Sequence, residues 1–227
     1  GEGLMDKINN KSNWTASLAL GSLWGLSEAG MGMALRGGCS RMLTGSIMTG
    51  AAIFFFSAGL AMNRKSTGLL LMLGIATVYK LLDAFFLQLP VLHGAIANPV
   101  FAFYTEVFAF ILIWKILDAR LKEKNAGRAL WGGITALLAV NLFPLVKYAT
   151  GIPACVYPGT QYPLALYFAP VAVALSALAC PLGMAAGERL AAYAAAESPK
   201  QKAALIFFFF SLISLIAVVC LRLGGKS

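Results

Sequence analysis

Long apolar runs recur along this chain from residue 14 to residue 222, separated by short polar segments. A helix needs about 20 mostly apolar residues to cross the hydrocarbon core of a bilayer. Runs of this length predict helices, because a helix satisfies its backbone polar groups within one segment where no water can reach them. The sequence therefore predicts an all-α, polytopic transmembrane bundle of six or seven spans, in a single domain over residues 1–227. The expected spans cover residues 14–35, 43–62, 68–88, 100–118, 129–147, 163–186 and 204–222.

Composition excludes a water-soluble globular domain. Hydrophobic residues make up 59% of the chain and charged residues only 12%, whereas about 25% of a typical soluble domain is charged. The formal net charge of +9 could indicate a nucleic-acid partner. However, the basic residues stand mostly in short loops between apolar runs, where the excess of Lys and Arg in cytoplasmic loops accounts for them. We therefore expect a lipid bilayer around the protein and no nucleic acid.

Lys and Arg divide unevenly between the two sides of the predicted bundle. The N-terminus and the second, fourth and sixth loops together carry eleven of them, and the opposite side carries five. Because the cytoplasmic side of a membrane protein holds the excess, the count predicts a cytoplasmic N-terminus. With seven spans, the C-terminus would then lie outside.

Ionisable side chains inside the spans are the strongest functional signal. Each costs about 2.5–3.5 kcal/mol to insert at a helix centre, so each is a functional hypothesis. In the predicted topology five polar groups from four helices share one depth, in the outer half of the membrane: Glu28, Lys80, Asp83, Glu106 and Asn141. Lys80 and Asp83 stand three residues apart, so they can pair on one helix face. Outer loops add further candidates at the rim: Arg36, His93, Asn98 and Tyr157.

This gathering predicts an outward-facing cavity that binds a ligand. A structural ion-pair network that holds helices together is the alternative, because charges in lipid must find partners. A proton or ion pathway is less favoured, since it would need relay groups through the full thickness of the membrane, and the cytoplasmic halves of the spans nearly lack them. Opposed charges at one depth suit a polar or zwitterionic molecule.

The sequence shows no motif that would assign catalysis. It contains no G-x-S-x-G, H-E-x-x-H or Walker A pattern. One His and four Cys without a C-x-x-C pair predict no metal site and no cofactor. Cys39 and Cys155 both fall in outer loops, and whether they form a bridge stays open.

Small residues on the first run, including Gly21-x-x-x-Gly25, allow close helix packing. Their partner is either another helix of this chain or another membrane subunit, and the sequence leaves both open.

The segment 21–32, GSLWGLSEAGMG, resembles the opening helix of a group of bacterial membrane proteins with a W-G-x-x-E-a-x-x-G pattern. The resemblance continues through TGSIM at 44–48, KLLD at 80–83, and Asn98-Pro99 followed by Glu106. In layout the chain is similar to the substrate-binding S components of energy-coupling-factor vitamin transporters. The resemblance implies six helices, an outward pocket for a vitamin-like molecule, and a transmembrane coupling subunit with ATPases as partners in the cytoplasmic (inner) membrane.

The chain departs from that layout in two respects. It has a seventh apolar run, and the alanine-spaced docking contact of such proteins is reduced to a loose series, Ala16, Ala19, Gly21 and Gly25. Our leading hypothesis is a membrane-embedded uptake protein for a small polar or zwitterionic molecule. An integral membrane enzyme is the first alternative, with Glu28, Asp83 or Glu106 as acid or base and Lys80 stabilising charge. An accessory subunit of a larger membrane complex is the second.

Overall fold

The computed structural model describes residues 14–30, 43–117, 119–196 and 200–224. These residues form helices joined by short turns and one longer loop, in which Val156 and Pro163 form an isolated bridge. A helix over residues 14–30 comes first. The elements that follow are α2 (Thr44–Asn63), α3 (Ser66–Leu87), α4 (Gly94–Ile116), α5 (Ala119–Glu123), α6 (Asn125–Leu142), η1 (Phe143–Leu145), α7 (Val146–Thr150), α8 (Leu164–Tyr167), α9 (Ala169–Ala196) and α10 (Lys200–Gly224).

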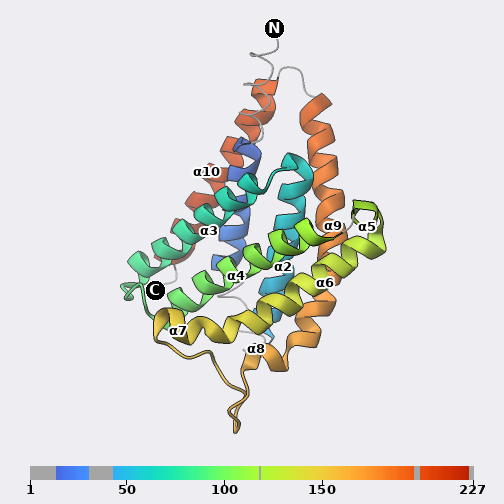
Figure 1. Cartoon of the computed structure of the whole chain (residues 1–227). Coiled ribbons are helices and arrows are strands. Elements are labelled where there is room, and N and C mark those ends of the chain that lie inside the picture. The colour runs from blue at the N-terminus through green and yellow to red at the C-terminus, as the bar shows by residue number, and fades with distance from the viewer. Residues whose placement is uncertain (1–13, 31–42, 118, 197–199, 225–227) are drawn as a thin grey trace.

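Within the described residues, six helices are long and apolar enough to cross a membrane. They are Thr44–Asn63, Ser66–Leu87, Gly94–Ile116, Asn125–Thr150, Ala169–Ala195 and Ala203–Gly224. The helix over residues 14–30 packs among them (Figure 1). The predicted all-α polytopic bundle is therefore confirmed, and the chain is a multi-pass membrane protein.

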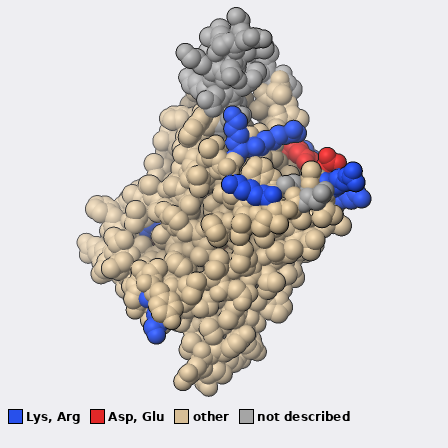
Figure 2. Space-filling model, viewed as in Figure 1, with Lys and Arg blue, Asp and Glu red and all other residues tan. Residues whose placement is uncertain are grey.

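The helices run back and forth along the bundle. The turn from α2 to α3, helix α5 and the start of α10 lie toward one end, which is uppermost in Figure 1. The turn from α3 to α4, the loop after α7 and the end of α10 lie toward the other end. Exposed basic residues gather toward the upper end, on the α2–α3 turn and beside α5, and the face in Figure 2 has a broad band with almost no charge.

Proline positions explain where the fifth and sixth spans break. Pro144 lies in η1, where the α-helix tightens into a 3₁₀ turn before continuing as α7. Helix α9 begins only at Ala169, with Pro170 in its first turn. The missing N–H of a proline is harmless there, because the first helical N–H groups have no helical partner. The loop and α8 occupy the segment between the end of α7 and the start of α9.

Aromatic rings form the centre of the bundle. Trp24 of the N-terminal helix is fully buried and meets Phe56 of α2 and Phe103 of α4 edge-on, with ring centroids 4.8 Å and 4.9 Å apart. Phe110 of α4 stacks on Trp131 of α6 at 4.4 Å. The Trp131 indole N–H also donates to the carbonyl of Phe110 at 3.2 Å. These contacts hold four helices together next to the residues predicted to form a site.

Helix α9 packs most closely on α2, through glycines. A Cβ placed on Gly183 would lie 2.3 Å from the carbonyl oxygen of Phe54, and one on Gly187 would lie 2.3 Å from that of Ala58. Only glycine allows such backbone approach, and a small-xxx-small spacing is the usual means of close helix contact in membranes. Neither glycine was among the small residues predicted from the sequence to make close helix contacts.

The small-residue face of the N-terminal helix is occupied by other helices of this chain. Gly21 and Gly25 lie against Met72 and Tyr79 of α3, with no room for a Cβ. Ala16 and Ala19, further up the same helix, form a buried cluster with Ala203 and Phe207 of α10. Helix α10 thus covers the alanines of the loose docking series.

Candidate functional site

A cavity of about 570 Å³ lies between the helices, toward the end of the bundle that holds the α3–α4 turn and the loop after α7. Sites for small molecules typically measure about 300–1,000 Å³. Polar side chains from four helices line part of the wall: Glu28, Thr44, Ser46, Thr49, Lys80, Asn98, Thr105 and Glu106. Apolar residues make up most of the remainder, including Met48, Phe103, Val140, Phe143, Leu164 and Phe168. The cavity is therefore amphipathic.

Helix α4 supplies the longest part of this wall. Its lining residues follow a helical spacing from Gly94 through Asn98 and Ala102 to Glu106, so they form one stripe. Pro99 lies within this stripe and has no N–H. The carbonyl of Ala95 consequently lacks its usual donor four residues on.

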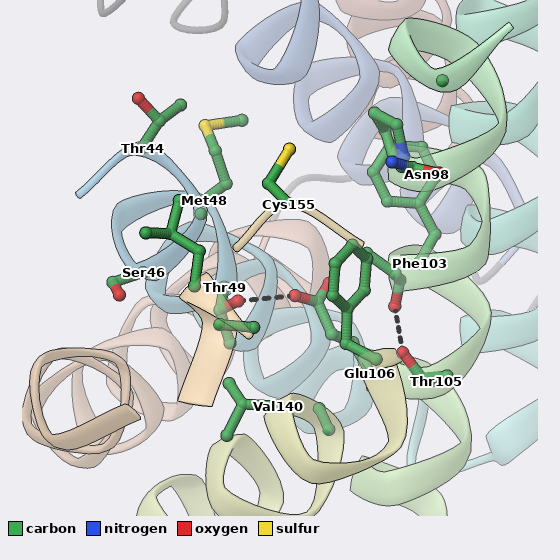
Figure 3. Close-up of a pocket in the computed structure, with 18 of the residues that line it drawn as sticks. Thr44, Ser46, Met48, Thr49, Asn98, Phe103, Thr105, Glu106, Val140 and Cys155 are labelled. Atoms are coloured by element: carbon green, nitrogen blue, oxygen red, sulfur yellow. Dashed lines mark hydrogen bonds between the residues drawn. The ribbon is translucent and has the colours of Figure 1, made fainter. Parts of the chain in front are cut away.

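Glu106 connects α4 to α2 across the cavity. Its carboxylate accepts a hydrogen bond from the Thr49 hydroxyl, with 2.8 Å between Oε1 and Oγ1 (Figure 3). The side chain is 95% buried, with a relative exposure of 5%. No described Lys or Arg forms a salt bridge with it.

Glu28 brings a second carboxylate to the same cavity from the N-terminal helix, one turn beyond the buried Trp24. It interacts electrostatically with Glu106, Lys80 and Asp83, so the four ionisable groups share one environment. Within the described residues, Glu28 also forms no salt bridge.

Lys80, Asp83 and Arg222 form a separate buried ion-pair network at the edge of the cavity. Lys80 lines the cavity, and its Nζ lies 3.1 Å from Oδ2 of Asp83. The Arg222 guanidinium reaches across from α10 and places its Nε 2.6 Å from Oδ1 of Asp83. Asp83 is only 1% exposed, and its buried carboxylate is paired with two cations. The expected pairing of Lys80 with Asp83 is observed.

Four of the residues singled out from the sequence line the cavity together, namely Glu28, Lys80, Asn98 and Glu106. Asp83 is buried behind Lys80 rather than at the wall. Asn98 carries a buried Oδ1 that has no hydrogen-bond partner among the described residues.

The remaining candidates lie elsewhere. His93 caps α4, its Nδ1 accepting from the Ala95 N–H at 3.2 Å. Asn141 is exposed and donates to the Leu137 carbonyl of its own helix at 2.7 Å. Tyr157 stacks on Tyr167 at 4.1 Å in the loop and α8, and its hydrogen bond raises the pKa of the Tyr167 hydroxyl above the ordinary value. Arg36 lies outside the described residues.

The structure adds Arg222 and three residues of the loop after α7 to those predicted from the sequence for the site. Arg222 stands at the end of the last apolar run, and its side chain is only 7% exposed and paired with Asp83. The loop after α7 contributes Ile152, Pro153 and Cys155 to the cavity wall. Cys155 is a free, exposed thiol, and Cys39 lies outside the described residues.

Fold and site together define a multi-pass α-helical membrane protein with an amphipathic internal cavity near one end of its bundle. No cluster of three or more His, Cys, Asp or Glu suited to a metal ion occurs in the described part of the chain. No family model matches the sequence, and no curated protein or solved structure matches it either.

Proposed function

We propose that the protein binds a small polar or zwitterionic, vitamin-like molecule in this cavity and takes it up across the cytoplasmic membrane, in the manner of an S component. The observation that carries the proposal is the convergence of Glu28, Lys80, Asn98 and Glu106 on one cavity of about 570 Å³. Charged groups inside a membrane protein mark substrate pathways when they face a cavity.

The pattern of pairing favours a ligand over simple helix anchoring. A network that only joins helices would pair its charges with one another, as Lys80, Asp83 and Arg222 do. Glu28 and Glu106 line the cavity outside any salt bridge with a described residue. A bound molecule would supply the missing partner.

Uptake would need an energy source, because the sequence carries no nucleotide-binding motif. The resemblance suggests a coupling subunit with ATPases. In this structure Ala16 and Ala19 are buried against Ala203 and Phe207 of α10. Such a subunit would therefore bind another face of the bundle or displace α10 from the N-terminal helix.

The proposal is tested by native mass spectrometry of the purified protein for a retained small molecule, followed by thermal-shift measurements with a metabolite panel. We expect one class of molecule to co-purify and to raise the melting temperature. The variant Thr49→Val removes the hydroxyl that orients Glu106 and should weaken that shift, and the surface variant Arg189→Gln should leave it unchanged. A protein without bound molecule and without any thermal shift would contradict the binding function and favour an accessory subunit.

An integral membrane enzyme is the second candidate, favoured by two carboxylates and a lysine at one cavity. Such a pair can divide the roles of acid and base. Turnover of a lipid-linked or periplasmic substrate by the purified protein, abolished by Glu28→Gln in a variant that still folds, would establish it.

A further inference from the structure

The charges around the cavity are unequal. Three carboxylates belong to the shared environment, from Glu28, Asp83 and Glu106, against the two cations of Lys80 and Arg222. Both cations lie on Asp83, at 3.1 Å and 2.6 Å. When all five groups are ionised, the described residues carry one negative charge in excess, and Glu28 and Glu106 are the carboxylates of this set that face the cavity.

Uncharged hydrogen-bond acceptors on the α4 wall also lack partners. Asn98 lines the cavity, and its buried acceptor Oδ1 has no donor among the described residues. Next to it, Pro99 leaves the Ala95 carbonyl without its helical N–H, and both residues line the cavity. A buried acceptor without a partner is energetically unfavourable. Residues of this wall therefore carry acceptors that a hydrogen-bond donor would satisfy.

Aromatic rings in the cavity wall can also attract a cation. Phe103, Phe143 and Phe168 all line the cavity, and the face of an aromatic ring attracts a cation within about 6 Å of its centre. Met48 and Val140 add aliphatic surface on the α2 and α6 sides (Figure 3). The wall thus combines hydrogen-bond acceptors and negative charge around Glu28 and Glu106 with apolar surface elsewhere.

We propose that the ligand is an organic ammonium cation with an apolar body, seated with its nitrogen toward Glu28 and Glu106. This inference rests on the proposed binding function and narrows it, because an anion or a neutral molecule would leave the excess negative charge of the cavity uncompensated. Lys80 does not recruit an anion in this arrangement, since its ammonium is paired with Asp83 and lies in the field of Glu28.

The test uses three probes of matched shape: 4-phenylbutylammonium, 4-phenylbutanol and 4-phenylbutanoate. Binding to the full-length protein in lipid nanodiscs is measured by thermal shift and by calorimetry. We expect the ammonium to bind at least tenfold more tightly than the alcohol, and the carboxylate not to bind. The double variant Glu28→Gln/Glu106→Gln should lose this preference while still binding the alcohol, which shows that its cavity is intact. The control Glu188→Gln, at an exposed carboxylate on α9, should keep it.

The outcomes separate the two proposals. If 4-phenylbutanol or 4-phenylbutanoate binds as tightly as the ammonium, the cation inference is overturned and the binding function stands. If none of the probes binds, the molecule retained in native mass spectrometry decides: a cation supports the inference and a neutral or anionic molecule overturns it. If no molecule is retained either, both proposals fail.

Discussion

Substituting Arg222 tests the buried network that joins α10 to α3. Asp83 is 1% exposed and accepts from the Arg222 Nε at 2.6 Å and from the Lys80 Nζ at 3.1 Å. Helix α10 has a mean hydropathy of 2.9 and presents most of its large side chains outward. The ion pair is accordingly one of its few directed contacts with the bundle.

The variant Arg222→Gln keeps most of the aliphatic stem and removes the charge. Deleting one partner of a buried pair costs about 3–5 kcal/mol, because the other charge stays buried. Lys80 remains beside Asp83, so we expect the lower end, about 3 kcal/mol. For a chain of this length each kcal/mol shifts the melting temperature by about 2–4 °C. The melting temperature should therefore fall by about 6–12 °C.

Thermal unfolding in detergent, followed by tryptophan fluorescence, measures this change, since Trp24 and Trp131 are buried. The exposed Arg189→Gln serves as the matched control and should alter stability by less than about 0.5 kcal/mol. The double variant Asp83→Asn/Arg222→Gln should be more stable than the sum of the two single losses, by about 1–3 kcal/mol. A shift below 2 °C for Arg222→Gln, or a double variant that shows no such recovery, would refute the reasoning.

Three further predictions concern packing, the cavity mouth and topology. Gly183→Ala should destabilise the protein by about 1–3 kcal/mol, because its Cβ would meet the Phe54 carbonyl oxygen at 2.3 Å; Gly74→Ala, in open space on α3, should stabilise it by up to about 1 kcal/mol. Equal melting temperatures for the two variants would contradict the packing. Maleimide labelling of Cys155 should slow when a molecule occupies the cavity, whereas labelling of the exposed Cys220 on α10 should not change; an unaffected Cys155 would place the molecule elsewhere. A phosphatase that is active only outside the cytoplasm should be active when it is fused to the C-terminus. An inactive phosphatase fusion, together with a fluorescent C-terminal fusion of a protein that fluoresces only in the cytoplasm, would reverse the predicted orientation.

The polar residues of the site show how far sequence reasoning reaches. Glu28, Lys80 and Glu106 could be grouped from the sequence because depth follows from position along a span and from the direction in which the span runs. Asn141 has the same depth but faces outward and bonds to its own helix. Depth is a one-dimensional quantity, and the rotation of a helix about its axis is decided by its packing against neighbours.

Partners between distant helices were likewise beyond the sequence. Arg222 and Asp83 lie 139 residues apart, and no local spacing relates them. The burial of Ala16 and Ala19 could not be predicted from the sequence either. It depends on Ala203 and Phe207 of α10, which packs along the N-terminal helix.

By itself, the sequence determined that this chain is an all-α membrane bundle whose charges collect in one half of the spans. These properties depend on the length and composition of contiguous segments. A segment long and apolar enough to cross the bilayer forms a helix there whatever its tertiary contacts. Only the tertiary structure decided which of those charges share a cavity and which are neutralised behind it. That outcome depends on close packing between helices, through glycines such as Gly183 and Gly187, and close packing is a property of helix pairs rather than of segments.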